Sequence, residues 1–241
     1  LLDLARRAGC VGLFIGFESV TPEGLHDLGR KSNMLSGRNI SASVERIQRH
    51  HILVVGSFII GLDSDRVGVG RLIAESADLY GVDSMNVLFL TPLPGTRLWR
   101  QLQAEGRIAK DAFPEDWKYY TLNYPVARYK YLSVDQVIDE MNECNSTFYS
   151  RSNILRRLGR NVAAGRTPLF TIVTNFTARR NSRLFAEVYA SGWRTSAISG
   201  GIEPAAETRG DLVDLWEAAA RQLRQLAMVL RLRIAWFFRQ S

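Results

Sequence analysis

Three residues that could contact a ligand stand at the ends of largely apolar stretches: Glu18, Gly61 and Thr91. A buried acid without a partner is costly, so we expect something to meet the carboxylate of Glu18. If the three stretches are parallel strands, their ends converge on one ligand site. A plainer interpretation stays open: Gly16 and Gly61 permit tight packing, and Glu18 caps the helix that follows.

Other catalytic chemistry finds little support in the sequence. The three histidines, at 26, 50 and 51, lack an HExxH or other paired zinc spacing, and no GxSxG or P-loop motif occurs. The aromatic stretch 113–133 is interleaved with Lys118, Arg128 and Lys130. It has the composition of a base-stacking surface, or of a long loop that packs over the mouth of a barrel. We expect the loop, and we do not expect nucleic acid as a partner.

Apolar stretches alternate with helical patterns, which predicts parallel strands joined by right-handed crossovers. Continuous Val, Ile, Leu and Phe runs are typical of strands covered on both faces. The fold class is therefore α/β, either half of a (β/α) barrel or an open sheet. The expected strands are residues 11–17, 52–62 and 84–91, and the expected helices around them are 1–8, 22–28, 41–51, 71–81 and 98–105.

Composition and charge restrict the class of protein. The 241 residues are 46% hydrophobic, enough for a real core, and contain only Cys10 and Cys144, which indicates a reducing compartment. No run of 18 apolar residues is present, so we expect a cytoplasmic chain that begins mid-protein. Residues 151–241 hold 15 arginines and 6 acids. Arginine favours anionic partners, nucleic acid or anionic lipid among them, although a solvated Arg-rich surface is the alternative.

The segments "LFIGFES", "GSFIIGLD" and "NVLFLTPLPGTRLW" together resemble the later half of a radical SAM enzyme. The most similar members carry an N-terminal cobalamin-binding domain. The resemblance is strong over residues 1–120 and weaker through 132–158. It implies a partial TIM-like (β/α) barrel of three parallel strands with outer helices, followed by a mainly helical C-terminal extension.

The resemblance implies contacts to S-adenosylmethionine. Glu18 matches the acid that contacts the ribose or the amino group, and such donors would satisfy its carboxylate. Arg30, with Lys31 as a substitute, matches the base that pairs with the methionine carboxylate, although a surface arginine is equally compatible with the sequence. The remaining matches are Ser57 near the ribose, Ile59, Gly61 and Leu62 beside the adenine, and Phe89 to Thr91 with backbone groups at the adenine edge.

The chain differs from the family pattern at the residues that bind the iron–sulfur cluster. The CxxxCxxC loop that holds the 4Fe–4S cluster has no counterpart, and Cys10 and Cys144 are interpreted as ordinary packed thiols. The first three strands and the cobalamin domain also have no counterpart. The cluster ligands, and the domain for any cobalamin, are therefore expected outside this chain, and the missing N-terminal half or a partner chain is the expected partner.

We divide the chain into residues 1–120 (C-terminal half of the barrel), 121–195 (helical extension), 196–210 (linker) and 211–241 (basic amphipathic helix). Within the extension, "PLFTIVTNFTARRNSRLFAEVYASGWR" can hold another short helix. The last helix suits peripheral contact with a membrane or packing against a partner.

Two hypotheses remain. The chain is the S-adenosylmethionine-contacting half of a radical SAM enzyme, with cobalamin-dependent methylation as one form of its chemistry and an unknown small-molecule or lipid-like substrate. The alternative is a non-catalytic module that docks through its Arg-rich tail.

Overall fold

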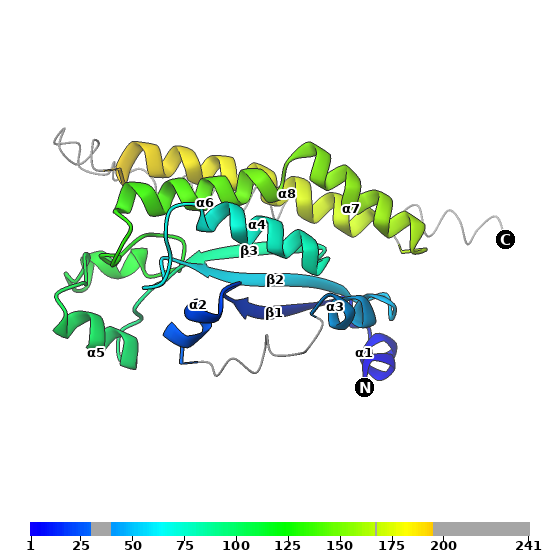
Figure 1. The fold of residues 1–241 in the computed structure, drawn as a ribbon, viewed down its shortest axis with the longest axis horizontal. Coiled ribbons are helices and arrows are strands. Elements are labelled where there is room, and N and C mark those ends of the chain that lie inside the picture. The colour runs from blue at the N-terminus through cyan, green and yellow to red at the C-terminus, as the bar shows by residue number, and fades with distance from the viewer. Residues whose placement is uncertain (30–39, 167, 195–241) are drawn as a thin grey trace. The chain divides into compact units, whose positions relative to one another are not determined.

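The computed structural model describes residues 1–29, 40–166 and 168–194, which lie in one compact unit, Leu1–Thr195. The predicted fold class is confirmed: parallel strands alternate with helices, and a helical extension follows (Figure 1). Arg30, Lys31, the expected linker and the expected basic helix lie outside the described residues. The elements of the barrel part are α1 (Leu2–Arg7), β1 (Gly12–Glu18), α2 (Pro22–Asp27), α3 (Ile40–Gln48), β2 (Leu53–Ile60), α4 (Val69–Tyr80), β3 (Ser84–Phe89) and α5 (Arg97–Ala104). The extension contains η2 (Glu115–Tyr119), α6 (Val134–Phe148), α7 (Arg151–Ala163) and α8 (Pro168–Gly192).

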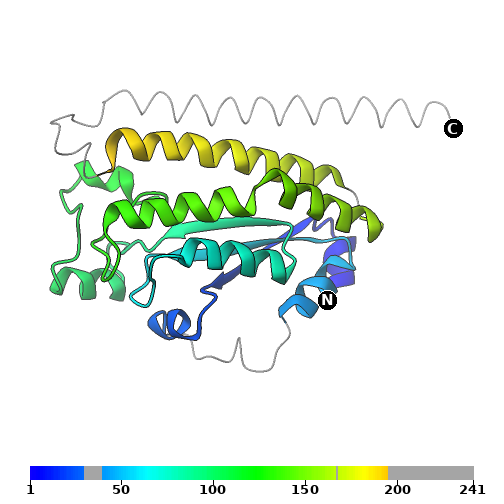
Figure 2. The same ribbon diagram turned by 45° about the horizontal axis from the view of Figure 1, so that its top comes forward.

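The sheet has the order β1-β2-β3, with both pairs parallel. Its two faces differ in burial because side chains alternate along a strand. On β2, the side chains of Val54, Phe58 and Ile60 are fully buried, whereas Val55 and Ile59 on the opposite face are half-buried. The helices α4 and α6 lie over the buried face (Figures 1 and 2).

The opposite face is open along β1, which corrects one expectation. We expected residues 11–17 to form a strand covered on both faces, and this is wrong: Phe14, which pairs with Val55 on the open face, is 64% exposed. A run of apolar residues cannot show whether another layer of the protein covers the second face. Among the described residues, β1 pairs only with β2.

A carboxylate from the extension caps the first turn of α4. Glu140, on α6, is only 4% exposed and accepts hydrogen bonds from the backbone N–H groups of Gly68 and Gly70, each at 2.7 Å. Both N–H groups belong to the helix start, where no intrahelical acceptor exists, and the negative charge also complements the helix dipole. This contact fixes the extension against the barrel helix.

The outer edge of β3 is occupied by groups that are not strands. The N–H of Leu90 donates to Ile60 on β2, so the odd-numbered residues of β3 direct their backbone groups away from β2. Two of them have partners outside the sheet: the N–H of Met85 donates to the hydroxyl of Tyr149 (3.0 Å), which in turn donates to the Met85 carbonyl, and the N–H of Phe89 donates to the carbonyl of Leu122 (3.0 Å). Just before the strand, Asn175 Nδ2 donates to the carbonyl of Asp83 (2.9 Å).

The helix α8 is longer than expected. It spans 25 residues instead of a short helix and runs beside β3, with Asn175 near the beginning of the strand and Tyr189 against Phe89 near its end. The fourteen residues from Asn175 to Tyr189 rise about 21 Å, close to the roughly 20 Å of the strand. Apolar periodicity does not reveal the full length of this helix, because its buried side includes polar residues, Thr171 and Asn175.

Many arginines of the basic half bind acids of the barrel instead of facing a partner. Asp78, at the end of α4, contacts Arg156 (2.6 Å), Arg157 (3.3 Å) and Arg160 (3.4 Å) of α7. Burial lowers the pKa of Arg157 to about 10, and Asp78 opposes this shift. The Arg-rich composition of α7 is therefore partly structural. None of the helices in the described ranges is long and apolar enough to cross a membrane.

Candidate functional site at the carboxyl ends of the strands

Glu18 ends β1 in a backbone conformation that few residues with a side chain adopt. Its φ is +66°, in the left-handed region, and the β1–β2 register is irregular between Gly16 and Glu18. The side chain folds back over Gly16: a Cβ added there would lie 3.1 Å from the Glu18 Cδ atom and nearer to a carboxylate oxygen. Glycine at 16 therefore provides the space that the carboxylate occupies. Glu18 is half-buried, less than the buried strand predicted.

The register places further polar groups beside this carboxylate. Gly16 pairs with Ser57 on β2, and Ser57 pairs with Asn86 on β3. Paired residues of parallel strands share a face, so Ser57 and Asn86 lie on the open face that the Glu18 carboxylate covers. Ser57 is 4% exposed, whereas Asn86 is exposed. Glu18, Ser57 and Asn86 form a polar row across this face, between the apolar residues Val55 and Ile59 of β2.

Gly61 makes a tight turn after β2 with φ of +96°. Its N–H and that of Leu62 donate to the carboxylate of Asp65, at 2.8 and 2.9 Å. Burial is the largest influence on Asp65 and raises its pKa to about 6, although the two backbone hydrogen bonds oppose the shift. The ring of Tyr129 fills the space where a side chain at Gly61 would be, with Cδ1 2.6 Å from an added Cβ. The absence of a side chain at Gly61 thus leaves room for the ring of Tyr129.

The hydroxyl of Tyr129 is buried and has no hydrogen-bond partner among the described residues. Burial raises the pKa of this hydroxyl, which therefore stays protonated and able to donate. An unpaired buried donor is unusual, because it loses its water without compensation. Tyr129 comes from the aromatic stretch 113–133 expected to pack over the barrel mouth, and its contact with Gly61 agrees with that expectation.

The end of β3 has fewer backbone groups available for a ligand than the sequence indicated. The N–H of Phe89 donates to the carbonyl of Leu122, and the carbonyl of Phe89 accepts from the hydroxyl of Thr91 at 3.0 Å. The side chain of Phe89 lies in the core, 1% exposed, and Thr91 is 8% exposed. The backbone groups expected at the adenine edge are therefore partly used within the chain, and their role remains a prediction.

The described residues do not fit an iron–sulfur cluster. They contain no group of three His, Cys, Asp or Glu side chains able to hold a metal ion. Cys144 is fully buried, with its sulfur 4.0 Å from that of Met85, and burial raises the pKa of its thiol. Cys10 is partly exposed, and its thiol lies 3.5 Å from the carbonyl of Gly12. The burial of Cys144 agrees with its interpretation as a packed thiol, whereas Cys10 is less packed than that interpretation predicted.

The structure thus brings Glu18 and Ser57 onto one face at the strand ends, beside a turn built on Gly61. Sequence reasoning missed Asn86, Asp65 and Tyr129. Local signals could have indicated two of them: Asp65 is an acid four residues after Gly61, and Asn86 is a polar residue inside an apolar strand. Tyr129 had no local signal, because its contact joins residues 68 positions apart. Chemically, the arrangement offers carboxylate, hydroxyl and amide groups for a polar ligand.

Comparison with known proteins places the chain in a class. Residues 96–197 match a family model described as a domain of unknown function (DUF4070). The chain is similar to the C-terminal part of radical SAM enzymes of the cobalamin-binding type, which confirms the resemblance seen in the sequence.

The relatives are methyltransferases by name. A hopanoid C-2 methylase from Rhodopseudomonas palustris is 28% identical over 163 residues, which is 68% of this chain and 29% of the relative. A bacteriochlorophyllide d C-12(1)-methyltransferase from Chlorobaculum tepidum is 27% identical over 65% of this chain and 32% of its own. An uncharacterized methyltransferase from Pyrococcus horikoshii is 26% identical over 62% and 31%. The chain therefore matches about a third of the length of each.

Proposed function

We propose that this chain is the S-adenosylmethionine-contacting part of a radical SAM methylating enzyme. The observation that carries the proposal is the polar row of Glu18, Ser57 and Asn86 on the open face at the carboxyl ends of parallel strands. Ligands of such folds gather at this end of the strands. The similarity to named methyltransferases supports methylation as the reaction.

In this proposal each residue contributes binding, not bond cleavage. The carboxylate of Glu18 accepts hydrogen bonds from the ribose hydroxyls or the amino group of S-adenosylmethionine, and the hydroxyl of Ser57 contacts the ribose. The turn at Gly61 and the donor of Tyr129 line the adenine side. Arg30, whose placement lies outside the described residues, pairs with the methionine carboxylate.

The cluster and any cobalamin belong to another part of the complete enzyme, since the described residues do not fit a cluster. Such a cluster, when bound, would supply the electron for reductive cleavage of S-adenosylmethionine, chemistry that no described residue of this chain provides. The open face of β1, and its edge that no strand of the described residues occupies, suit docking of the missing half, or of a partner chain that supplies it. The substrate, a small or lipid-like molecule, then meets the same open face.

The test is the substitution Glu18→Gln in the complete enzyme, with Glu23→Gln as the matched control on the exposed surface of α2. Loss of one charge-assisted hydrogen bond weakens S-adenosylmethionine binding by roughly 10- to 150-fold. Glu23→Gln leaves the affinity unchanged. Equal affinity of the Glu18 variant and the unmodified enzyme would refute the proposed contact.

A second test concerns the division of roles. After anaerobic incubation with iron, sulfide and a reductant, this chain alone gives no 4Fe–4S absorption and releases no 5′-deoxyadenosine. Either signal would mean that Cys10 or Cys144 has a role that the geometry denies. The alternative function, a docking module that uses the Arg-rich tail, depends on residues outside those described and stays a prediction.

A further inference from the structure

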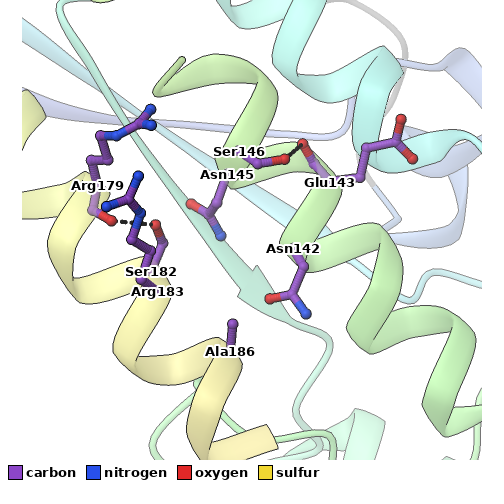
Figure 3. A pocket seen from close by; sticks show the side chains of 8 residues that line it. All are labelled: Asn142, Glu143, Asn145, Ser146, Arg179, Ser182, Arg183 and Ala186. Atoms are coloured by element: carbon purple, nitrogen blue, oxygen red, sulfur yellow. Dashed lines mark hydrogen bonds between the residues drawn. The ribbon is translucent and has the colours of Figure 1, made fainter. Parts of the chain in front are cut away.

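A groove lies between α6 and α8, on the helical extension. Its volume is about 320 Å³, enough for a phosphate group and several waters. Figure 3 shows its two walls, one from each helix, with polar side chains directed into the space between them. The lining residues are Asn142, Glu143, Asn145, Ser146, Arg179, Ser182, Arg183 and Ala186.

Two arginines one turn apart on α8 line this groove without a carboxylate partner. Arg179 donates to the main-chain carbonyl of Tyr149, which uses one of its five N–H groups. Arg183 makes no hydrogen bond and no ion pair with any residue in the described ranges. Three arginines of α7 differ, because Arg156, Arg157 and Arg160 contact Asp78.

The acid that lines the groove does not neutralise these charges. The carboxylate of Glu143 bonds Arg71 of α4 at 2.9 Å, and Figure 3 shows it directed away from Arg179 and Arg183. The pKa of Arg179 is lowered first by burial and then by the positive charges of Arg183 and Arg151. The groove therefore concentrates like charges, and a bound anion would relieve their repulsion.

We propose that the groove between α6 and α8 binds the phosphate group of a ligand. A phosphate monoester carries a charge of about −1.5 to −2 at neutral pH, which matches two arginines better than a single carboxylate does. The planar guanidinium groups of Arg179 and Arg183 present paired donors to its oxygens. On the facing wall, Asn142 offers an amide donor that has no partner among the described residues.

The surroundings allow two sources for that phosphate. Ile172 and Phe176 are 38% and 50% exposed and precede Arg179 and Arg183 on α8 at spacings of three, four and seven residues. These spacings place them on the same flank of the helix, so apolar side chains border the charged groove. A lipid headgroup would bring acyl chains to this border, whereas a free phosphate compound would use the groove alone.

The experiment compares three forms of the full chain: unmodified, Arg183→Gln, and the control Arg180→Gln. Arg180 is the neighbouring exposed arginine of α8 and does not line the groove. Arg183 is substituted because it has no internal contact, so its loss leaves the packing of α6 and α8 intact. Inorganic phosphate is titrated at constant ionic strength and followed calorimetrically, and vesicles of phosphatidylcholine with and without phosphatidic acid are tested by flotation.

We expect saturable phosphate binding that Arg183→Gln weakens about 10-fold and Arg180→Gln leaves unchanged. Vesicle binding that needs phosphatidic acid, that Arg183→Gln reduces and that free phosphate competes away would identify a lipid headgroup. Phosphate binding, with vesicle binding either absent or left unchanged by Arg183→Gln, would identify a free phosphate compound. Absence of phosphate binding, or equal weakening by the two variants, would overturn the proposal.

Discussion

The contact between α4 and α6 leaves no room for a side chain at Gly70, and the substitution Gly70→Ala tests this closeness. A Cβ added at Gly70 would lie 2.8 Å from the carbonyl carbon of Glu140 and nearer still to its oxygen. The neighbouring atoms are backbone atoms, so no side-chain rotation relieves the clash. The two helices must separate, and the hydrogen bonds from Gly68 and Gly70 to the Glu140 carboxylate stretch with them.

The expected loss follows from these two effects. Overpacking costs about 1–3 kcal/mol, and weakening two charge-assisted hydrogen bonds adds about 2 kcal/mol, so the free energy of unfolding falls by roughly 3–5 kcal/mol. The matched control is Gly159→Ala on α7, where an added Cβ meets nothing within 4 Å. This control should raise the stability by about 0.5–1 kcal/mol, because alanine favours a helix over glycine.

Pulse proteolysis after equilibration in urea, at low protein concentration to limit association, measures the folded fraction of both variants. If Gly70→Ala unfolds at the same urea concentration as the unmodified chain, the close approach of α4 and α6 is not as described. If Gly159→Ala is destabilised as much as Gly70→Ala, the effect does not come from the contact with Glu140.

Three further predictions concern the carboxyl group of Asp65, the edge of β1 and the C-terminal residues. The pKa of Asp65 is raised from 3.8 to about 6 in the folded state, so its contribution to stability is complete below pH 3.8 and is lost as the pH rises through 6, roughly 3 kcal/mol in all. Urea denaturation between pH 4 and 7 should show this loss of stability, and Asp65→Asn should abolish it. If the stability of the variant depends on pH as steeply as that of the unmodified chain, Asp65 is not the group responsible. The unpaired edge of β1 should make the isolated chain associate, which sedimentation measures, and a monomer with a cooperative melt would contradict it. If residues 223–239 form an interfacial helix, the chain should bind anionic vesicles and be released by salt; a chain deleted after Gly210 that binds equally well would exclude the tail.

The sequence was sufficient for the order and type of the barrel elements because each strand is a compact apolar run and each helix has one apolar side. Thr21 and Pro22 even marked the beginning of α2, and the hydroxyl of Thr21 does accept from the N–H of Gly24 at 3.1 Å. Burial of β1 could not be read in the same way. The same residues suit a strand with one covered face or two, and only the neighbours decide.

Polar packing set a second limit on prediction. The helix α8 buries Thr171 and Asn175 against Asn161 and the chain near Asp83, and apolar periodicity does not detect such contacts. The candidate site was likewise predictable only where its features are local in the sequence. Local signals indicated Glu18 and Gly61, because a strand end and a glycine turn are local features. The backbone conformation of Glu18 and the approach of Tyr129 depend on residues distant in the chain.

The satisfied outer edge of β3 makes the sheet extensible in one direction only. The side chains of Tyr149 and Asn175 and the loop at Leu122 occupy backbone groups of Asp83, Met85 and Phe89 along that edge, so within the described residues a new strand meets fewer obstacles at β1. A sheet with two open edges can polymerise into a fibre, because each added copy leaves another edge available. A sheet with one open edge closes when two copies meet, edge to edge, around a two-fold axis. Any self-association through the described strands should therefore stop at a dimer.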